Sequence, residues 1–302
     1  METNNNIAKL QYTKGWKSLD EQLNLMISRG LLLGDYPREK ALNKLHFIGY
    51  YRLSGYSYSF KKSIDSDQFA ENTYFSDIIE LYKFDRNLRL LIIDAIERIE
   101  IALRSSLSYE LGKIDPFILE TDDRYESLRD VIEEVISTSK EDFCEHFRSK
   151  YQRPYPIWML LNIIDFGTLI KVYANSDPNI KAKIAYKFGV HSTMVFFSWI
   201  NSIKFVRNKC AHHARLWNTH ILRIPRVPKN KPQYKWIKGL DFIKRPEAKL
   251  WFTLKIIEFM LSTLKASTNW SNKLENLLSE FPKLKSNKSP TVENMKYIIE
   301  DS

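Results

Sequence analysis

The 302-residue chain has little glycine and little cysteine, and each shortage excludes some classes of protein. Only nine glycines occur, and the long segments between them repeat Leu, Ile, Glu and Lys at helical spacing. This pattern predicts a mostly helical protein. The two cysteines, Cys144 and Cys210, lie far apart in the sequence, so we expect no disulfide framework. A reducing, cytoplasmic compartment fits that usage.

Long apolar runs are also absent. No run approaches the roughly 18 residues that a membrane-spanning helix needs. The apolar segment Leu88–Ile101 is interrupted by five charged residues and is typical of a core helix instead. The opening residues, METNNNIAKL, lack the apolar stretch of a secretory signal peptide. We therefore expect neither secretion nor contact with a membrane.

The sequence also lacks Cys and His residues at the spacing that is typical of metal sites. Cys144 and His146 form one small cluster, and Cys210, His212 and His213 form another. Structural zinc sites use ligands in spaced pairs such as C-x2–4-C, and neither cluster has that spacing. We expect no metal and no other cofactor.

Positive charge is abundant. Lys and Arg number 46 against 36 Asp and Glu, which gives a net charge of +10, and a hydrophobic fraction of 44% supports a real core. Such an excess favours a polyanionic partner, either nucleic acid or an anionic membrane. The alternative is a basic soluble protein without such a partner.

The densest group of reactive side chains is the string RNKCAHHARLWN, residues 207–218, called here the motif. It follows an apolar-periodic run that predicts a helix. If the helix continues through the motif, Asn208, His212 and Arg215 share one face at i, i+4 and i+7, with Arg207 beside it. Arg donates a rigid fork of hydrogen bonds to phosphate, and His transfers protons near neutral pH. The pattern indicates a phosphate site.

The two neighbouring histidines are not equivalent in this helix. Successive residues diverge by about 100°, so His213 leaves the face that carries His212. We expect His213 to bond to backbone or to a partner chain. His212 has two interpretations that remain open: a proton-transfer group, or a structural histidine satisfied by a neighbouring carboxylate.

The motif also carries a resemblance. Arg207 to His212 fits the R-x4–6-H pattern of HEPN ribonucleases, and the whole motif resembles the signature of Abi-like proteins, the AbiD/AbiF group of bacterial phage-defence proteins. Other stretches of the chain also resemble Abi-like proteins: YYRLSGY at 50–56, FDRNLR at 84–89, IERIE at 96–100, and P-x-W-M with FGTL between 156 and 169.

This resemblance implies an all-α, HEPN-like helical bundle. We assign residues 1–72 to an N-terminal helical segment, 73–222 to the bundle, and 223–302 to a basic loop with C-terminal helices. The resemblance further implies a metal-independent endoribonuclease of an abortive-infection or toxin–antitoxin system, with a homodimeric site and a small non-coding RNA as first candidate regulator. The catalytic residues are then Arg207, Asn208 and His212, with His213 and Arg215 as a secondary site.

The residue types suit that chemistry. The 2′-hydroxyl of RNA attacks its own phosphodiester, and the reaction needs a base, an acid and cations for the phosphorane. One histidine does not readily serve as both base and acid in one turnover. Two copies related by a two-fold axis supply both, because an isologous dimer brings the same face of each chain together.

Basic residues elsewhere predict further RNA contacts. The segment Leu222–Lys244 is rich in Pro and basic residues, with Tyr234 and Trp236 among them, which is typical of a nucleic-acid footprint or of an ordinary solvated loop. The predicted contacts are Arg52, Arg223, Arg226, Lys229, Lys231 and Lys235. The tyrosines around Arg52 either stack on bases or pack the N-terminal helices. A non-catalytic protein that holds a structured RNA is the competing class.

Local signals predict particular helices. Ser18 and Glu21 form a capping-box pattern at the start of a helix. A long helix is expected from Tyr74 to Leu111, an acidic one from Asp123 to Arg148, and one from Ile157 to Phe166. One acidic residue of the long helix either orients the Arg/His pair or belongs to surface ion pairs at i and i+4.

Overall fold

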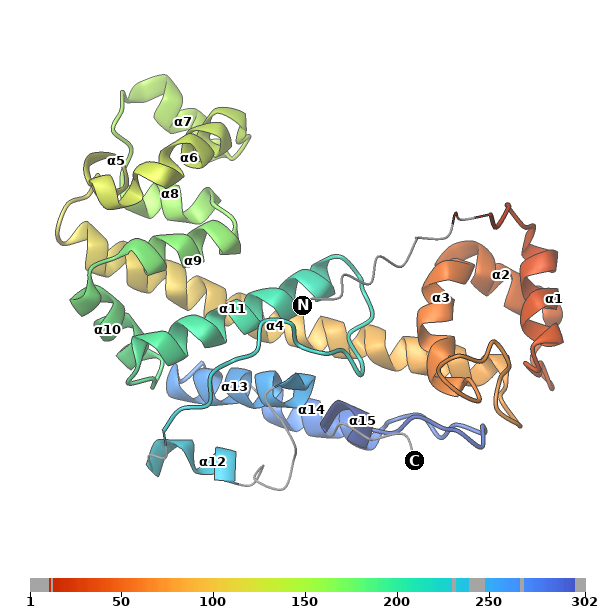
Figure 1. The fold of residues 1–302 in the computed structure, drawn as a ribbon. Helices are drawn as coiled ribbons and strands as arrows, with labels where there is room; N and C mark the ends of the chain where they lie inside the picture. Colours follow the sequence, from red (N-terminus) through yellow and green to blue (C-terminus); the bar gives the residue numbers. More distant parts are fainter. Residues whose placement is uncertain (1–10, 12, 230–231, 239–247, 267–268, 297–302) are drawn as a thin grey trace, which may run out of the picture. The chain divides into compact units, whose positions relative to one another are not determined.

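The computed structural model describes residues 11, 13–229, 232–238, 248–266 and 269–296. Within those ranges the fold is all-α, as predicted: helices and isolated β-bridges occur, and no strand does (Figure 1). The chain divides into two compact units. The first unit comprises residues 1–82 with 282–290, and the second comprises 83–281 with 291–302. The boundary falls inside the longest helix, α4 (Phe75–Gly112).

The first unit begins with the helix that the capping box predicts. In α1 (Leu19–Ser28), the Ser18 hydroxyl accepts from the Glu21 N–H at 3.3 Å, and the Glu21 carboxylate accepts from the Ser18 N–H at 2.7 Å. Then follow α2 (Arg38–Ile48), α3 (Tyr50–Ser57) and the 3-10 helix η1 (Tyr58–Phe60). Residues 282–290 join this unit, and there Ser286 and Thr73 pair their buried hydroxyls at 2.7 Å.

The tyrosine-rich helix α3 has both a packed side and an exposed side. Tyr56 is buried and meets the ring of Tyr82 edge-on, with the centroids 5.4 Å apart. This contact confirms the packing interpretation for Tyr56. Tyr51 is 91% exposed, and Arg52 beside it is also exposed.

In the second unit, α4 supplies a continuous apolar stripe that includes Leu88, Ile92, Ile96 and Ile99, each fully buried. The unit also contains α9 (Phe166–Asn175), α10 (Pro178–Lys187), α11 (Thr193–Ala211) and α13 (Leu250–Thr263), with α11 packed on the other three. The C-terminal helices are α14 (Trp270–Ser279) and α15 (Glu293–Lys296). Trp270 fixes α14 by donating to the carbonyl of Leu91 at 2.8 Å.

Two predicted helices are each divided. The acidic helix predicted from Asp123 to Arg148 is divided into η2 (Asp123–Tyr125), α6 (Glu126–Thr138) and α7 (Asp142–Lys150), and α5 (Ile118–Thr121) precedes them. The next helix, α8 (Ile157–Ile163), ends before Phe166 because the Asp165 side chain accepts from the N–H groups of Gly167 and Thr168 and caps α9. Short polar side chains that satisfy free N–H groups favour such a new start over continuation.

The basic loop is more structured than its sequence pattern indicates. It contains η3 (Pro232–Tyr234) and α12 (Lys235–Lys238). The rings of Tyr234 and Trp236 each lie 6.1 Å from the ring of Trp199, and both also contact Phe259. Tyr234 is buried and Trp236 is partly buried against the same rings, so the aromatic residues of this loop pack inward. This packing corrects the interpretation of the loop as basic residues interleaved with aromatics that bind nucleic acid.

No helix in the described ranges has the length and apolarity needed to cross a membrane.

Candidate active site

The motif lies at the end of α11, and the helix ends at Ala211. His212 caps it: its N–H donates to the Asn208 carbonyl at 2.9 Å, so His212 keeps helical register with Asn208. The next two N–H groups, of His213 and Ala214, donate to carbonyls of the last turn at 3.0 and 2.9 Å. This is a Schellman motif, which closes a helix and redirects the chain.

The early end of the helix corrects one prediction. Arg215 lies beyond the Schellman motif, so it does not share a helical face with Asn208 and His212 at i+7. His213 leaves the helical path too, with φ at +55° in the left-handed region. For a non-glycine residue that conformation is unfavourable by about 1–2 kcal/mol. The surrounding contacts must therefore stabilise the turn.

A buried ion pair from α4 holds the segment after the turn. The Asp85 carboxylate is fully buried and accepts from the N–H of Leu216 at 3.1 Å and from the N–H of Trp217. It also pairs with Arg89, which is 5% exposed and donates to the Ala214 carbonyl at 3.4 Å. The surface ion-pair interpretation is thus wrong for this pair. A sequence signal exists, because Asp85 occupies a position of the apolar stripe, where a charge needs partners.

A second acidic residue of α4 lies beside the motif. The Oε2 atom of Glu100 lies 3.8 Å from the Nε of Arg207, and its Oε1 lies 2.5 Å from a terminal nitrogen of Arg104. Arg104 is itself fixed by the carbonyls of Leu161 and Ile164, the latter at 2.8 Å. Glu100 is therefore the carboxylate next to Arg207 whose identity the sequence left open.

The Glu100 contact leaves the outer end of Arg207 available. The Arg207 side chain is 36% exposed, and among the described residues its two terminal nitrogens have no partner. His212 and Asn208 are exposed, and the His212 imidazole likewise has no hydrogen-bond partner within the described ranges. A guanidinium fork, an amide and an imidazole thus face solvent within one and a half turns of chain.

Electrostatics at this helix end depends on nearby cations. The carbonyl end of a helix carries partial negative charge and disfavours phosphate. Arg207, Lys209 and Arg215 supply opposing charge. Burial and then the charge of Arg215 lower the pKa of Lys209, so the cations are crowded. An anion bound here would relieve that repulsion. Lys209 was not singled out from the sequence.

The cysteine of the motif is not a nucleophile candidate. Cys210 is 4% exposed, and burial with the nearby charge of Asp85 raises the pKa of its thiol to about 12. The reactive form of cysteine is the thiolate, which is scarce at neutral pH when the pKa is that high. Among the described residues no group of three or more His, Cys, Asp and Glu side chains is placed to hold a metal ion.

The other predicted contacts lie on exposed surfaces. Four of them form what we call the basic segment: Arg223, Arg226, Lys229 and Lys235, all exposed. Its backbone is tied to α11, because the Arg226 N–H donates to the Ser198 hydroxyl at 2.8 Å and the Arg226 carbonyl accepts from Trp199 at 2.9 Å. Lys231 lies outside the described residues. Arg52 is on α3, in the first unit.

The fold and this helix end define an all-α protein with a cation-rich site that contains an exposed Arg and His. The sequence model described as Abi-like protein matches residues 43–218, more than half of the chain. The chain belongs to the Abi-like protein family. The match ends with the last residue of the motif and does not include the basic segment. No curated protein and no solved structure matches the chain.

Proposed function

We propose that the chain is a metal-independent endoribonuclease of the HEPN type that acts in abortive-infection phage defence or in a toxin–antitoxin system. Membership of the Abi-like family supports the biological role. The observation that carries the chemistry is the helix end itself. His212 stays in register with Asn208, and Arg207 turns its outer nitrogens to solvent while Glu100 lies at its Nε.

In the proposed reaction the 2′-hydroxyl oxygen attacks the adjacent phosphorus, and the bond from phosphorus to the 5′ oxygen breaks. The 2′-hydroxyl proton passes to a base, and the leaving 5′ oxygen takes a proton from an acid. His212 fills one of these roles. Arg207 stabilises the charge of the phosphorane, and Asn208 orients the substrate. The products end in a 2′,3′-cyclic phosphate and a 5′-hydroxyl.

A second chain would complete this chemistry. Each motif offers one exposed histidine in helical register, whereas the reaction uses a base and an acid. In a two-fold dimer, His212 of each chain supplies one of the two. Mixing parent chains with a growing excess of His212→Ala chains tests this arrangement. Activity falls with the square of the fraction of parent chains if each site needs His212 from both chains, and it falls in direct proportion to that fraction if one His212 serves each site.

The basic segment is the proposed binding surface for RNA, including a small non-coding RNA that regulates activity. Its four side chains are exposed, while its backbone is anchored to α11, the helix that carries the motif. Positive side chains at fixed positions suit the phosphates of a folded RNA. The same observation favours the second candidate function, a non-catalytic protein that holds a structured RNA.

Substrate chemistry separates the two functions. Labelled RNA incubated in EDTA should be cut to products with a 2′,3′-cyclic phosphate end. The same RNA with one 2′-deoxyribose at the cut position should resist at that position, because the attacking oxygen is missing. RNA that is bound but left intact would favour the non-catalytic function, and cleavage of the deoxy position would contradict the mechanism.

A further inference from the structure

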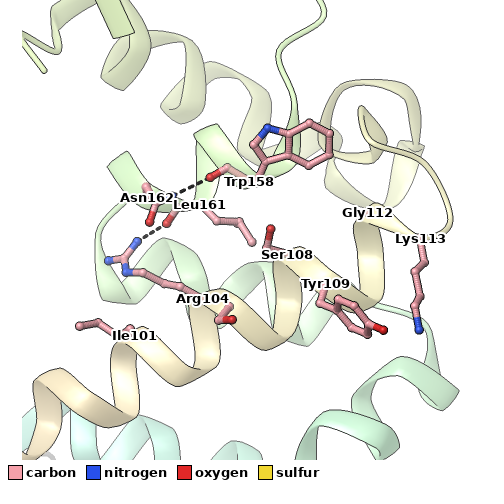
Figure 2. Close-up of a pocket in the computed structure, with 10 residues that line it drawn as sticks. Ile101, Arg104, Ser108, Tyr109, Gly112, Lys113, Trp158, Leu161 and Asn162 are labelled. Atoms are coloured by element: carbon pink, nitrogen blue, oxygen red, sulfur yellow. Dashed lines mark hydrogen bonds between the residues drawn. The ribbon is translucent and has the colours of Figure 1, made fainter. Parts of the chain in front are cut away.

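A cleft of about 600 Å³ lies between the C-terminal half of α4 and α8. Figure 2 shows Arg104 and Ser108 extending from α4 toward α8, which carries Trp158 and Asn162. The proposed mechanism uses none of these side chains. The volume lies within the range of sites for small organic groups.

Two aromatic side chains that line the cleft are accessible. Trp158 is 51% exposed and Tyr109 is 59% exposed, whereas Trp199, Trp217 and Trp270 are at most 1% exposed. A half-exposed indole at the edge of a cleft offers a flat apolar face to a ligand. Such faces bind bases of single-stranded nucleic acid by stacking, with little dependence on base identity.

Polar groups accompany these rings. Ser105 and Ser108 line the cleft, and neither hydroxyl has a hydrogen-bond partner among the described residues. At the Tyr109 end, the Lys113 ammonium lies 4.1 Å from the Tyr109 ring centroid and the Lys187 ammonium lies 5.3 Å from it. A flat face, hydroxyls and ammonium groups together match a nucleobase with its phosphate better than they match an apolar peptide.

The cleft is joined to the motif through one carboxylate. Arg104 lines the cleft and contacts Oε1 of Glu100, while Arg207 of the motif contacts Oε2 of the same side chain. Glu100 is 14% exposed and Arg104 is 15% exposed, so this bridge is held in place. A strand whose phosphate lies at Arg207 therefore has an aromatic cleft on the other side of Glu100.

We propose that this cleft binds an unpaired base of the RNA strand, next to the phosphate that the motif cleaves. The inference rests on the proposed function for its substrate class. Trp158 stacks on the base, Ser105 and Ser108 bond to its edge, and Lys113 attracts a flanking phosphate. The site thereby selects single-stranded RNA, because a base inside a duplex cannot enter the cleft.

The test measures affinity in a His212→Ala background, so that bound RNA is not cut. The probe is a labelled short single-stranded RNA of mixed sequence. Replacing Trp158 by Ala should weaken binding by roughly 5- to 150-fold, the range for loss of one base–aromatic stack. Trp158→Phe should keep most of the affinity. Trp16→Ala is the matched control, since Trp16 is 88% exposed and lies outside the cleft, and it should bind as the parent does.

Two further arms identify the ligand. An abasic site is placed at each position of the RNA in turn. At one position it should weaken RNA binding by the protein that keeps Trp158, and at that position it should leave RNA binding by the Trp158→Ala variant unchanged. Ser108→Phe, which fills the cleft and keeps Trp158, should mimic Trp158→Ala. Unchanged affinity in both cleft variants would overturn the proposal, as would an equal loss with duplex RNA. The proposal would also be overturned if the cleft variants lost self-association and kept their RNA affinity, because the cleft would then bind a second copy of the chain. These results do not depend on cleavage, so a chain that binds RNA without cutting it refutes the proposed function and not the cleft.

Discussion

Replacing Asp85 should damage this protein far more than replacing another aspartate of the same helix. Asp85 is fully buried, pairs with Arg89, and accepts two backbone N–H groups from the segment that follows the motif's turn. Asp85→Ala leaves the Arg89 guanidinium buried without its carboxylate. Breaking a buried ion pair in this way destabilises a protein by about 3–5 kcal/mol.

The magnitude translates into a measurable shift. For a unit of this size, each kcal/mol of stability corresponds to about 2–4 °C in Tm. Asp85→Ala should therefore lower Tm by about 6–20 °C in a thermal melt followed by circular dichroism. Arg89→Met added to Asp85→Ala should recover part of the loss, because the uncompensated charge is gone.

The same helix provides the control. Asp94 pairs with Arg98 at 3.1 Å with the same i, i+4 spacing, but their side chains are 45% and 39% exposed. Exposed helix pairs contribute about 0.3–0.5 kcal/mol, so Asp94→Ala should shift Tm by no more than about 2 °C. Equal shifts for Asp85→Ala and Asp94→Ala would refute the claim that Asp85 anchors the segment after the turn.

Three further predictions concern the turn, the basic segment and the thiols. His213→Gly should be more stable than His213→Ala by about 1 kcal/mol in urea denaturation, because both variants remove the imidazole and only Gly is unstrained at positive φ; equal stabilities would contradict the left-handed turn. Neutralising the basic segment should weaken RNA binding for all sequences and reduce the slope of log affinity against log salt concentration by about 0.7 for each phosphate that the protein no longer neutralises. An unchanged slope would exclude the basic segment as the binding surface. Cys144 and Cys210 are both buried, and burial raises the pKa of the Cys210 thiol to about 12, so iodoacetamide at neutral pH should label neither until the protein unfolds; rapid labelling of the native protein would contradict their burial.

Much of the fold follows from local sequence signals. The capping box at Ser18 and Glu21 and the long apolar stripe that ends at Gly112 each predict a helix that the structure contains. Family motifs likewise indicate an Abi-like protein, and the matched range confirms it. Periodicity fails where a helix stops without glycine or proline. Asp165 starts a new helix through its side chain, and His213 ends α11 in a conformation that glycine usually adopts.

The site was harder to predict than the fold because its support is tertiary. The sequence singles out Arg207 and His212 but leaves open which acidic residue accompanies them. Glu100 and Asp85 lie on α4, more than 100 residues earlier, and only the packing of α4 in this unit brings them to the motif. Asp85 lies on the apolar stripe of α4, but no local pattern shows that its partners lie within the motif, after the turn.

The most direct test of the proposed ribonuclease site is the rate of RNA cleavage in EDTA by two single-histidine variants. His212→Ala removes the exposed imidazole that stays in helical register with Asn208, and His191→Ala removes an exposed imidazole that precedes the same helix. Loss of one proton-transfer group lowers a rate by roughly 10²- to 10⁴-fold. The cleavage rate of His212→Ala should fall by that factor, although the variant still folds and binds RNA. His191→Ala should cleave RNA at the parent rate. Full activity in His212→Ala, or cleavage that EDTA abolishes in the parent, would contradict the proposed site.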